Sequence, residues 1–468
     1  MLTEKLYRGV TLSPPFSKEG QGWFVKKLSQ PFFHLPPFGR AGVGIRGGLS
    51  TMSHLLSLIL LLFLSTLTTR ATTPDSLRHW GVAVVGSPSR ALVMDGFQRK
   101  WQKGKSNGSL ALELSYSSLP SDSNQYAADF GYPTLSLGMK YAWNHGVTMR
   151  RTADPDWGMA EMVDYDSYMG NTVMLYGRFA RPFHRGKRWE IDYSFDFGVG
   201  YSATKYHPDN NVDNELIGSH WLIYFGAGLH ATYRVAPQWG LRMGIDYWHL
   251  SNGALNRPNK GANFLGPSLG VVYYPYYEQV LHPDPLLRSH HFKGYWFARA
   301  ALSLGAKTLN EEWQRTQFHT PKGDPEYRTD QFTLYPAYAL QLDVMRRYAL
   351  RWASGIGLDV FYGSYNHRVK HIDQAAGSTV DHSPWSVGIA AKHEVYYGRV
   401  RLHMSLGFYL FRRMGENAKE VEQPYYERIG LHYELPHMGG LSIGANVQAH
   451  RTKADLTEIV ITYPFLKW

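Results

Sequence analysis

The sequence predicts an all-β fold of about sixteen antiparallel strands, and three observations carry this prediction. From Ser109 onward, runs of strand length alternate between apolar and polar residues, and no long amphipathic helix is predicted. The gaps between the runs alternate between short turns and long loops. Aromatic residues make up 15% of the chain, an abundance typical of the aromatic girdles of outer-membrane β-barrels.

The composition excludes several kinds of site and partner. The chain has no cysteine, so disulfides, a thiol nucleophile and thiolate metal ligands are excluded. The mean hydropathy of −0.34 fits a barrel, because half of each strand faces a polar lumen. Residues 1–51 hold seven Lys or Arg and two Glu, and so contribute +5 of the formal +11. The remaining chain is mildly basic, and we expect no nucleic-acid partner.

The first 72 residues are expected to be absent from the mature protein. Residues 1–51 show no periodicity, and we interpret them as an upstream translation artefact that precedes a start at Met52. Residues 55–64 are mostly Leu or Ile, and this run is too short to span a bilayer. Together with the Thr-rich stretch that follows, it predicts a signal peptide over residues 52–72.

Strand-like runs bounded by turn residues fill the mature chain. The first eight are placed at 109–117, 133–143, 146–151, 170–180, 189–200, 219–234, 238–250 and 263–274. The second eight are placed at 292–304, 331–344, 348–361, 384–397, 399–411, 424–434, 440–450 and 455–465. If the first strand runs outward, the last runs inward and ends in aromatic residues, which is typical of barrels handed to the barrel-insertion machinery.

The two sets of strands resemble each other, which predicts a tandem duplication. Tyr132-Pro133 and Tyr335-Pro336 each open the second strand of their set. We expect one eight-stranded barrel over residues 73–275, a polar linker over 276–291 and a second, degenerate barrel over 292–468. A single sixteen-stranded barrel is the alternative, since it has the same even strand count.

The last hairpin of the first set places polar side chains on an apolar strand face. The alternation over residues 239–247 puts His249 and Ser251 on the apolar face, and the alternation after the hairpin adds Asn263. A hydroxyl and an imidazole two residues apart are the minimum for a base-activated nucleophile, with a third polar group to orient the imidazole.

The loop of the same hairpin could supply an oxyanion site. Asn252, Gly253 and Asn259 bring side-chain amides and backbone N–H groups near the hydroxyl, as stabilisation of an oxyanion requires.

This hairpin resembles the outer-membrane lipid A 3-O-deacylase family (PagL type), many relatives of which are labelled acyloxyacyl hydrolase. The resemblance is carried by His249-Leu-Ser251-Asn252, by Pro258-Asn259-x-Gly261 and by the apolar alternating strand after them. It implies that His249 is the base and Ser251 the nucleophile, and that Asn252 and Asn259 belong to the oxyanion site.

Asn263 departs from the family pattern, because the family has a catalytic Glu at the matching position. An Asn can hold an imidazole tautomer, but it cannot stabilise an imidazolium by charge. The resemblance implies a serine esterase that removes an ester-linked acyl chain from lipid A of lipopolysaccharide, at the outer leaflet, with neither cofactor nor metal. The alternative is a non-enzymatic barrel, either a pore or a structural and interaction protein, that has lost the catalytic acid.

The second half is expected to be inert. His450 falls on the polar face of its strand, and Arg451-Thr452 stand where the first half has Ser-Asn. The other histidines show no metal-like spacing on a common face. Acidic residues within strands would be costly facing lipid, so we expect those of the second half to line a lumen: Asp343, Asp359 and Glu394.

Overall fold

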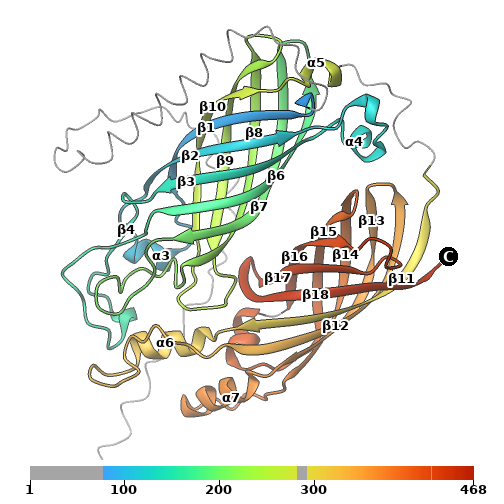
Figure 1. Ribbon diagram of the computed structural model, residues 1–468. Coiled ribbons are helices and arrows are strands. Elements are labelled where there is room, and N and C mark those ends of the chain that lie inside the picture. The colour runs from blue at the N-terminus through green and yellow to red at the C-terminus, as the bar shows by residue number, and fades with distance from the viewer. Residues whose placement is uncertain (1–76, 282–291, 423) are drawn as a thin grey trace, which may run out of the picture. The chain divides into compact units, whose positions relative to one another are not determined.

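The computed structural model describes residues 77–281, 292–422 and 424–468, which contain two closed antiparallel barrels of eight strands each (Figure 1). The tandem arrangement preferred from the sequence is therefore confirmed over the single large barrel. The segments interpreted as an artefact and a signal peptide lie outside the described residues, as does most of the expected linker.

The first barrel is closed by β1, which pairs with β2 on one side and with β10 on the other. Its sheet order is β1-β10-β9-β8-β7-β6-β3-β2. The strands are β1 (Trp80–Ala91), β2 (Ser106–Tyr116), β3 (Thr134–Trp143), β6 (Thr172–Arg185), β7 (Trp189–Ser202), β8 (Trp221–Arg234), β9 (Trp239–Ser251) and β10 (Ala262–Tyr273).

The second barrel runs through β11 to β18 in sequence order, and β11 closes it against β18. All eight strands fall where the alternation predicted them. They are β11 (Tyr295–Lys307), β12 (Tyr335–Ala349), β13 (Trp352–Gly363), β14 (Trp385–Tyr397), β15 (Val400–Arg412), β16 (Tyr425–Glu434), β17 (Ser442–His450) and β18 (Lys453–Lys467).

Short helices and one small sheet lie in the connections, and no helix of the described residues is long and apolar enough to cross a membrane. The α-helices are α3 (Gly96–Trp101), α4 (Gln125–Asp129), α5 (Tyr277–Val280), α6 (Asn310–Phe318) and α7 (Asn366–Ala375). Three further single-turn elements are η3 (Pro120–Asp122), η4 (Pro155–Trp157) and η6 (Ala418–Glu422). The small sheet pairs β4 (Thr148–Met149) with β5 (Ser167–Tyr168).

Two strand predictions for the first barrel were wrong. Its first strand is β1, which the sequence prediction missed because Pro88 and several Ser and Gly residues weaken the strand signal. The predicted strand 146–151 is not part of the barrel, since only Thr148–Met149 is extended and it pairs with β5. Val147 and Met149 are buried in an apolar cluster that also contains side chains of the barrel strands. This burial accounts for the apolar residues that resembled a strand.

Each lumen is filled by buried ion pairs instead of an open channel. In the first barrel, Arg178 binds Glu113 and Asp196, each at 2.8 Å. In the second, Arg299 binds Asp343 at 2.8 Å, and Lys392 and Arg428 bind Asp359. The prediction that Asp343, Asp359 and Glu394 line the lumen is confirmed, because all three are almost fully buried among cations.

Exposed and partly exposed aromatic pairs mark both ends of the first barrel on its outer surface. At the end with short turns 186–188 and 235–238, Trp189 packs on Tyr233 and Trp239 packs on Tyr273. At the opposite end, Tyr141 packs on Trp143 and Tyr201 packs on Trp221. Between these ends the outer surface is apolar, as in barrels that span an outer membrane. We call the two ends the turn end and the loop end.

Candidate active site

The candidate site lies on the outer surface of the β9–β10 hairpin, near the loop end of the first barrel. The register pairs His249 directly with Asn263, so both side chains lie on one face. Ile245 and Leu265 lie on the same face and are 59% and 41% exposed. Polar groups of the site therefore stand at the edge of an apolar surface that faces lipid.

The orientation of the imidazole is fixed by hydrogen bonds on this face. Asn263 Oδ1 lies 2.8 Å from His249 Nδ1 and also accepts a hydrogen bond of 2.7 Å from the Tyr247 hydroxyl. A carbonyl oxygen can only accept, so the proton of the neutral imidazole lies on Nδ1 and the lone pair lies on Nε2. Sequence reasoning missed Tyr247 as a site residue, although its position two residues before His249 on one strand face was a usable signal.

Ser251 is the last residue of β9 and is mostly buried, with 7% of its surface exposed. Its backbone pairs with Ile223 of β8, and the strand period places its side chain on the face of His249. Within the described chain, no hydrogen bond joins the Ser251 hydroxyl to His249. The fold thus brings His249 and Asn263 together, while Ser251 lies on the same face and, among the described residues, has no hydrogen bond to either.

Three expected oxyanion residues lie in the loop 252–261. The Asn252 backbone N–H donates to Asn259 Oδ1 at 2.9 Å, and the Asn252 side-chain amide donates to the Asn256 carbonyl at 3.0 Å. The Asn252 backbone N–H and one N–H of its side-chain amide are thus engaged within the loop. Since Asn259 presents its oxygen to Asn252, its NH₂ group points away from that bond. Gly253 has a φ of +61°, and its N–H makes no hydrogen bond within the described residues.

The site loop is anchored to the neighbouring loop between β7 and β8. The backbone N–H groups of Lys260 and Gly261 donate to the Glu215 and Leu216 carbonyls, each at 3.0 Å. Gly261 has a φ of +74°, and a Cβ there would lie 2.6 Å from His249 Cε1. A glycine is therefore required both by the backbone and by the imidazole that packs against it.

The opposite face of the hairpin is a rigid support. Trp248 and Phe264 are fully buried and stack with ring centroids 3.9 Å apart. They belong to a buried apolar cluster near the loop end that also contains Leu250. Because neighbouring residues on a strand alternate in direction, this packing holds the outward side chains of residues 247, 249 and 251 in register.

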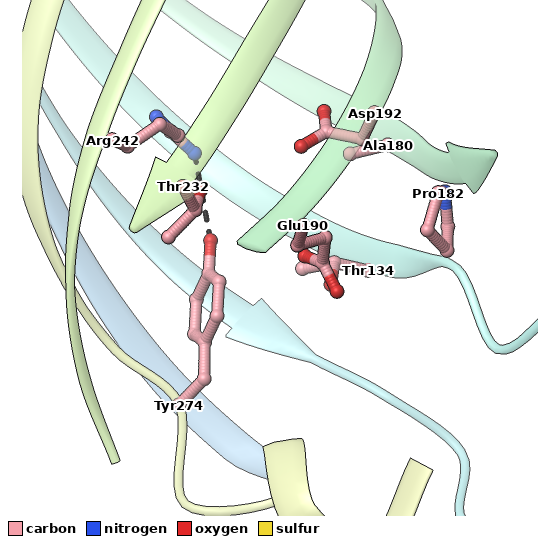
Figure 2. Close-up of a pocket in the computed structure, with 8 residues that line it drawn as sticks. All are labelled: Thr134, Ala180, Pro182, Glu190, Asp192, Thr232, Arg242 and Tyr274. Atoms are coloured by element: carbon pink, nitrogen blue, oxygen red, sulfur yellow. Dashed lines mark hydrogen bonds between the residues drawn. The ribbon is translucent and has the colours of Figure 1, made fainter. Parts of the chain in front are cut away.

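A small cavity lies inside the first barrel at the turn end, away from the hairpin tip (Figure 2). Its volume of about 10 Å³ is room for one water molecule. Figure 2 shows Arg242 bound to the Tyr274 hydroxyl, with Glu190 and Asp192 on the other side of the space. This polar gap is too small for a lipid or sugar and is separate from the candidate site.

One cluster in the second barrel offers metal-ligand atoms. The side chains of Glu422, His450 and Asp455 place one ligand atom each within 4.8 Å of one another. Sequence reasoning missed the cluster because Glu422 lies outside the hairpin that carries His450 and Asp455. Both carboxylates already form ion pairs, with Arg412 and Lys307, and these cations balance the charge that would attract a metal ion.

The equivalent hairpin of the second barrel has no outward histidine at its tip. His450 is 4% exposed and shares a hydrogen bond of 2.7 Å with the Tyr409 hydroxyl inside the barrel. This inward placement agrees with the polar face assigned to it from the sequence.

Two family models match the chain. Residues 131–272 match the model described as lipid A 3-O-deacylase (PagL), and residues 296–468 match the model described as acyloxyacyl hydrolase, C-terminal domain. The first match contains β3 to β10 with the hairpin, and the second contains most of the second barrel. Both confirm the family resemblance carried by the hairpin motif. Among curated proteins, none matches the sequence of the chain.

Several solved structures are similar to the chain. The crystal structure of the outer membrane enzyme PagL is 16% identical, with 41% of this chain and 98% of that chain covered and a TM-score of 0.25. Outer membrane protein Omp33 of Acinetobacter baumannii is 8% identical, with 83% and 99% covered and a TM-score of 0.14. The toluene transporter TodX of Pseudomonas putida is 9% identical, with 83% and 88% covered and a TM-score of 0.16.

Proposed function

Since the chain belongs to the lipid A 3-O-deacylase (PagL) family of outer-membrane β-barrels, we propose that it is a serine esterase acting on lipid A. It would remove an ester-linked acyl chain from lipopolysaccharide in the outer leaflet. The observation that carries this proposal is the hydrogen bond between His249 and Asn263 on a lipid-facing surface. It leaves the Nε2 lone pair of His249 available to a nucleophile on the same strand face.

In the proposed reaction, Ser251 is the nucleophile and His249 the base. Rotation of the Ser251 side chain brings its hydroxyl toward Nε2, which takes the proton as the oxygen attacks the ester carbonyl. The tetrahedral intermediate then collapses to an acyl-serine, and His249 returns the proton to the departing sugar oxygen. Water, deprotonated by the same imidazole, releases the fatty acid and restores the Ser251 hydroxyl.

Two groups of the site loop are proposed to stabilise the oxyanion. The Gly253 N–H and the Asn259 NH₂ group are not engaged within the loop, whereas the Asn252 backbone N–H and one N–H of its side-chain amide are. In known esterases and proteases, removal of one such donor costs about 3–4 kcal/mol of transition-state stabilisation. Asn252 is then proposed to position Asn259 rather than to touch the substrate.

The chemistry of the surface supports a lipid substrate over a soluble one. An acyl chain can lie along the exposed side chains of Leu241, Ile245 and Leu265 while its ester reaches the polar groups at the end of the strand. Lipid A presents its esters at this depth, beside the headgroups. A soluble ester without a long acyl chain would bury little apolar surface on this strand face and would gain little binding free energy from it.

Mass spectrometry of lipid A from cells that produce the protein tests the proposal. Cells with the native chain should lose a 3-hydroxyacyl group from lipid A, and Ser251→Ala should abolish the loss, because the substitution removes the proposed nucleophile. Ser219→Ala is the matched control, since Ser219 lies in a loop at the same end of the barrel and should leave the product pattern unchanged.

One observation favours the alternative that the protein is a non-enzymatic barrel. Asn263 carries no charge, so the imidazolium formed during the reaction lacks a carboxylate partner on this face. Within this alternative, buried ion pairs in both lumens favour a structural or interaction role, because a pore needs an open lumen. If native and Ser251→Ala cells give the same lipid A pattern, and the purified protein leaves model esters intact, this alternative replaces the esterase.

A further inference from the structure

Four side chains of the second barrel form a row across neighbouring strands. The register pairs Trp296 of β11 with Arg346 of β12, Arg346 with Ser354 of β13, and Ser354 with His393 of β14. Directly paired residues share a face of the sheet. We call Trp296, Arg346, Ser354 and His393 the rim row.

The rim row faces lipid. The outward neighbours along its strands are apolar and exposed: Val344 by 42%, Ile356 by 61% and Ile389 by 46%. Residues at odd spacing from these point into the lumen, where Asp343 and Lys392 form buried ion pairs. The strand alternation therefore separates the rim row from the charged interior.

The rim row lies at the periplasmic end of the barrel. The turns at 350–351 and 398–399 are short, and short turns belong to the periplasmic side of outer-membrane barrels. Ser354 is the third residue of β13, so it stands within about 10 Å of the strand's start at Trp352. Trp296 and Tyr348, which are 41% and 44% exposed, are typical of the aromatic belt at the headgroup level.

Polar donors converge on this level of the surface. The Ser354 hydroxyl and His393 Nδ1 share a hydrogen bond of 2.8 Å, and the Tyr348 hydroxyl lies 3.4 Å from the Ser354 oxygen. The Arg346 guanidinium stands 5.5 Å from the centre of the Trp296 ring. Arg346 is exposed and forms no ion pair within the described residues. Arg346 is therefore a cation beside lipid and near hydroxyl groups, and no anion among the described residues balances its charge.

We propose that the rim row binds the phosphate of a phospholipid headgroup in the periplasmic leaflet. The planar guanidinium of Arg346 can donate two parallel hydrogen bonds to a phosphate, with its face held by Trp296. The hydroxyls of Ser354 and Tyr348 supply further donors to the same oxygens. The acyl chains lie over the apolar neighbours Val344, Ile356 and Ile389 on the strands above.

A Ser–His pair is also the minimum for a base-activated nucleophile. His393 uses Nδ1 for the Ser354 hydroxyl, and within the described residues no hydrogen bond orients its Nε2. A base-activated serine requires such an orienting group on the second ring nitrogen. The geometry therefore points to binding, and cleavage of the lipid is a distinct outcome of the test.

The experiment uses the full chain purified in detergent, with phosphatidylglycerol titrated and bound lipid counted by native mass spectrometry. Arg346→Gln keeps much of the length of the side chain and removes the charge, so the affinity should fall about tenfold. Ser354→Ala should weaken binding by a smaller factor. Arg399→Gln is the matched control, because Arg399 is exposed in the turn 398–399, outside the rim row, and its loss should leave the affinity unchanged.

Four results would overturn the proposal. Equal affinities for native and Arg346→Gln protein would show that the rim row does not bind the headgroup. An equal loss in Arg399→Gln would reduce the effect to general electrostatics. Displacement of the lipid by millimolar inorganic phosphate would assign the site to free phosphate, and a lysophospholipid product that disappears in Ser354→Ala would assign it to an esterase. Unchanged heat-modifiable migration of each variant confirms that it is folded.

Discussion

A single side-chain oxygen decides the protonation of the candidate base. Asn263 Oδ1 accepts hydrogen bonds from both Tyr247 and His249, which fixes the amide orientation and the imidazole tautomer together. What this oxygen cannot supply is a full negative charge opposite the imidazolium. The residue at position 263 therefore determines how far the base is stabilised once it has accepted a proton.

Asn263→Glu should accelerate deacylation, because a carboxylate at this position accepts the same two hydrogen bonds and adds charge. We expect a gain in kcat/KM of at least about tenfold, which corresponds to roughly 1.4 kcal/mol of transition-state stabilisation. The measurement is the rate of fatty-acid release from lipid A in mixed micelles.

Asn263→Gln is the control for this substitution, since Gln matches the length of Glu without its charge. Equal rates for the Glu and Gln variants would show that charge at this position does not limit the reaction. A drop in both would indicate that the longer side chain breaks the contact with His249.

At the scale of the element, the hairpin combines predictable strands with an unpredictable loop. The period of two was enough to place His249, Ser251 and Asn263 on the lipid-facing side. The hydrogen bond between Asn252 and Asn259 depends on a loop with positive φ angles, which an alternation pattern does not predict. If the first strand of the barrel runs outward, β9 also runs outward and its hairpin lies at the outer end. The predicted strands give the same direction, because they omit β1 but include one extra strand at 146–151.

Gly261→Ala should impair the site without opening the barrel. The new methyl group would contact the His249 ring and force an L-residue into a left-handed backbone conformation, so we expect activity to fall about tenfold or more. Activity and thermal unfolding of the variant should be measured together.

Gly377→Ala provides the matched comparison. Gly377 has a φ of +82°, and a methyl group at this position would meet no atom within 4 Å. Gly377→Ala therefore has the same kind of backbone strain as Gly261→Ala, but its methyl group contacts no other side chain. Activity that falls equally in both variants would mean that backbone strain, and not the packing of His249, explains the loss.

At the scale of the molecule, each barrel closes on itself. β1 pairs with β10, and β11 pairs with β18, so neither sheet needs a strand from the other to satisfy its edges. The strand count could be predicted from the sequence, and the internal duplication favoured two barrels over one, but the strand pairs that close each barrel could not be predicted. Both topologies have the same strands, and only the closing pairs distinguish them.

Residues 73–280 produced alone should fold in detergent and migrate as a heat-modifiable band, because their sheet is already closed. The full chain treated in the same detergent is the reference. Persistent aggregation of the fragment, while the full chain folds, would show that the first barrel depends on the second for folding.

The packed lumen of the first barrel also determines how a substrate arrives. With ion pairs filling the interior and the hairpin facing outward, the proposed substrate, lipid A, would reach the candidate residues His249 and Ser251 by diffusing sideways within its leaflet. Turnover would then follow the mole fraction of lipid A in the membrane plane, not its concentration in the surrounding solution. Diluting the leaflet with an inert amphiphile would slow the enzyme even though the total amount of substrate stayed constant.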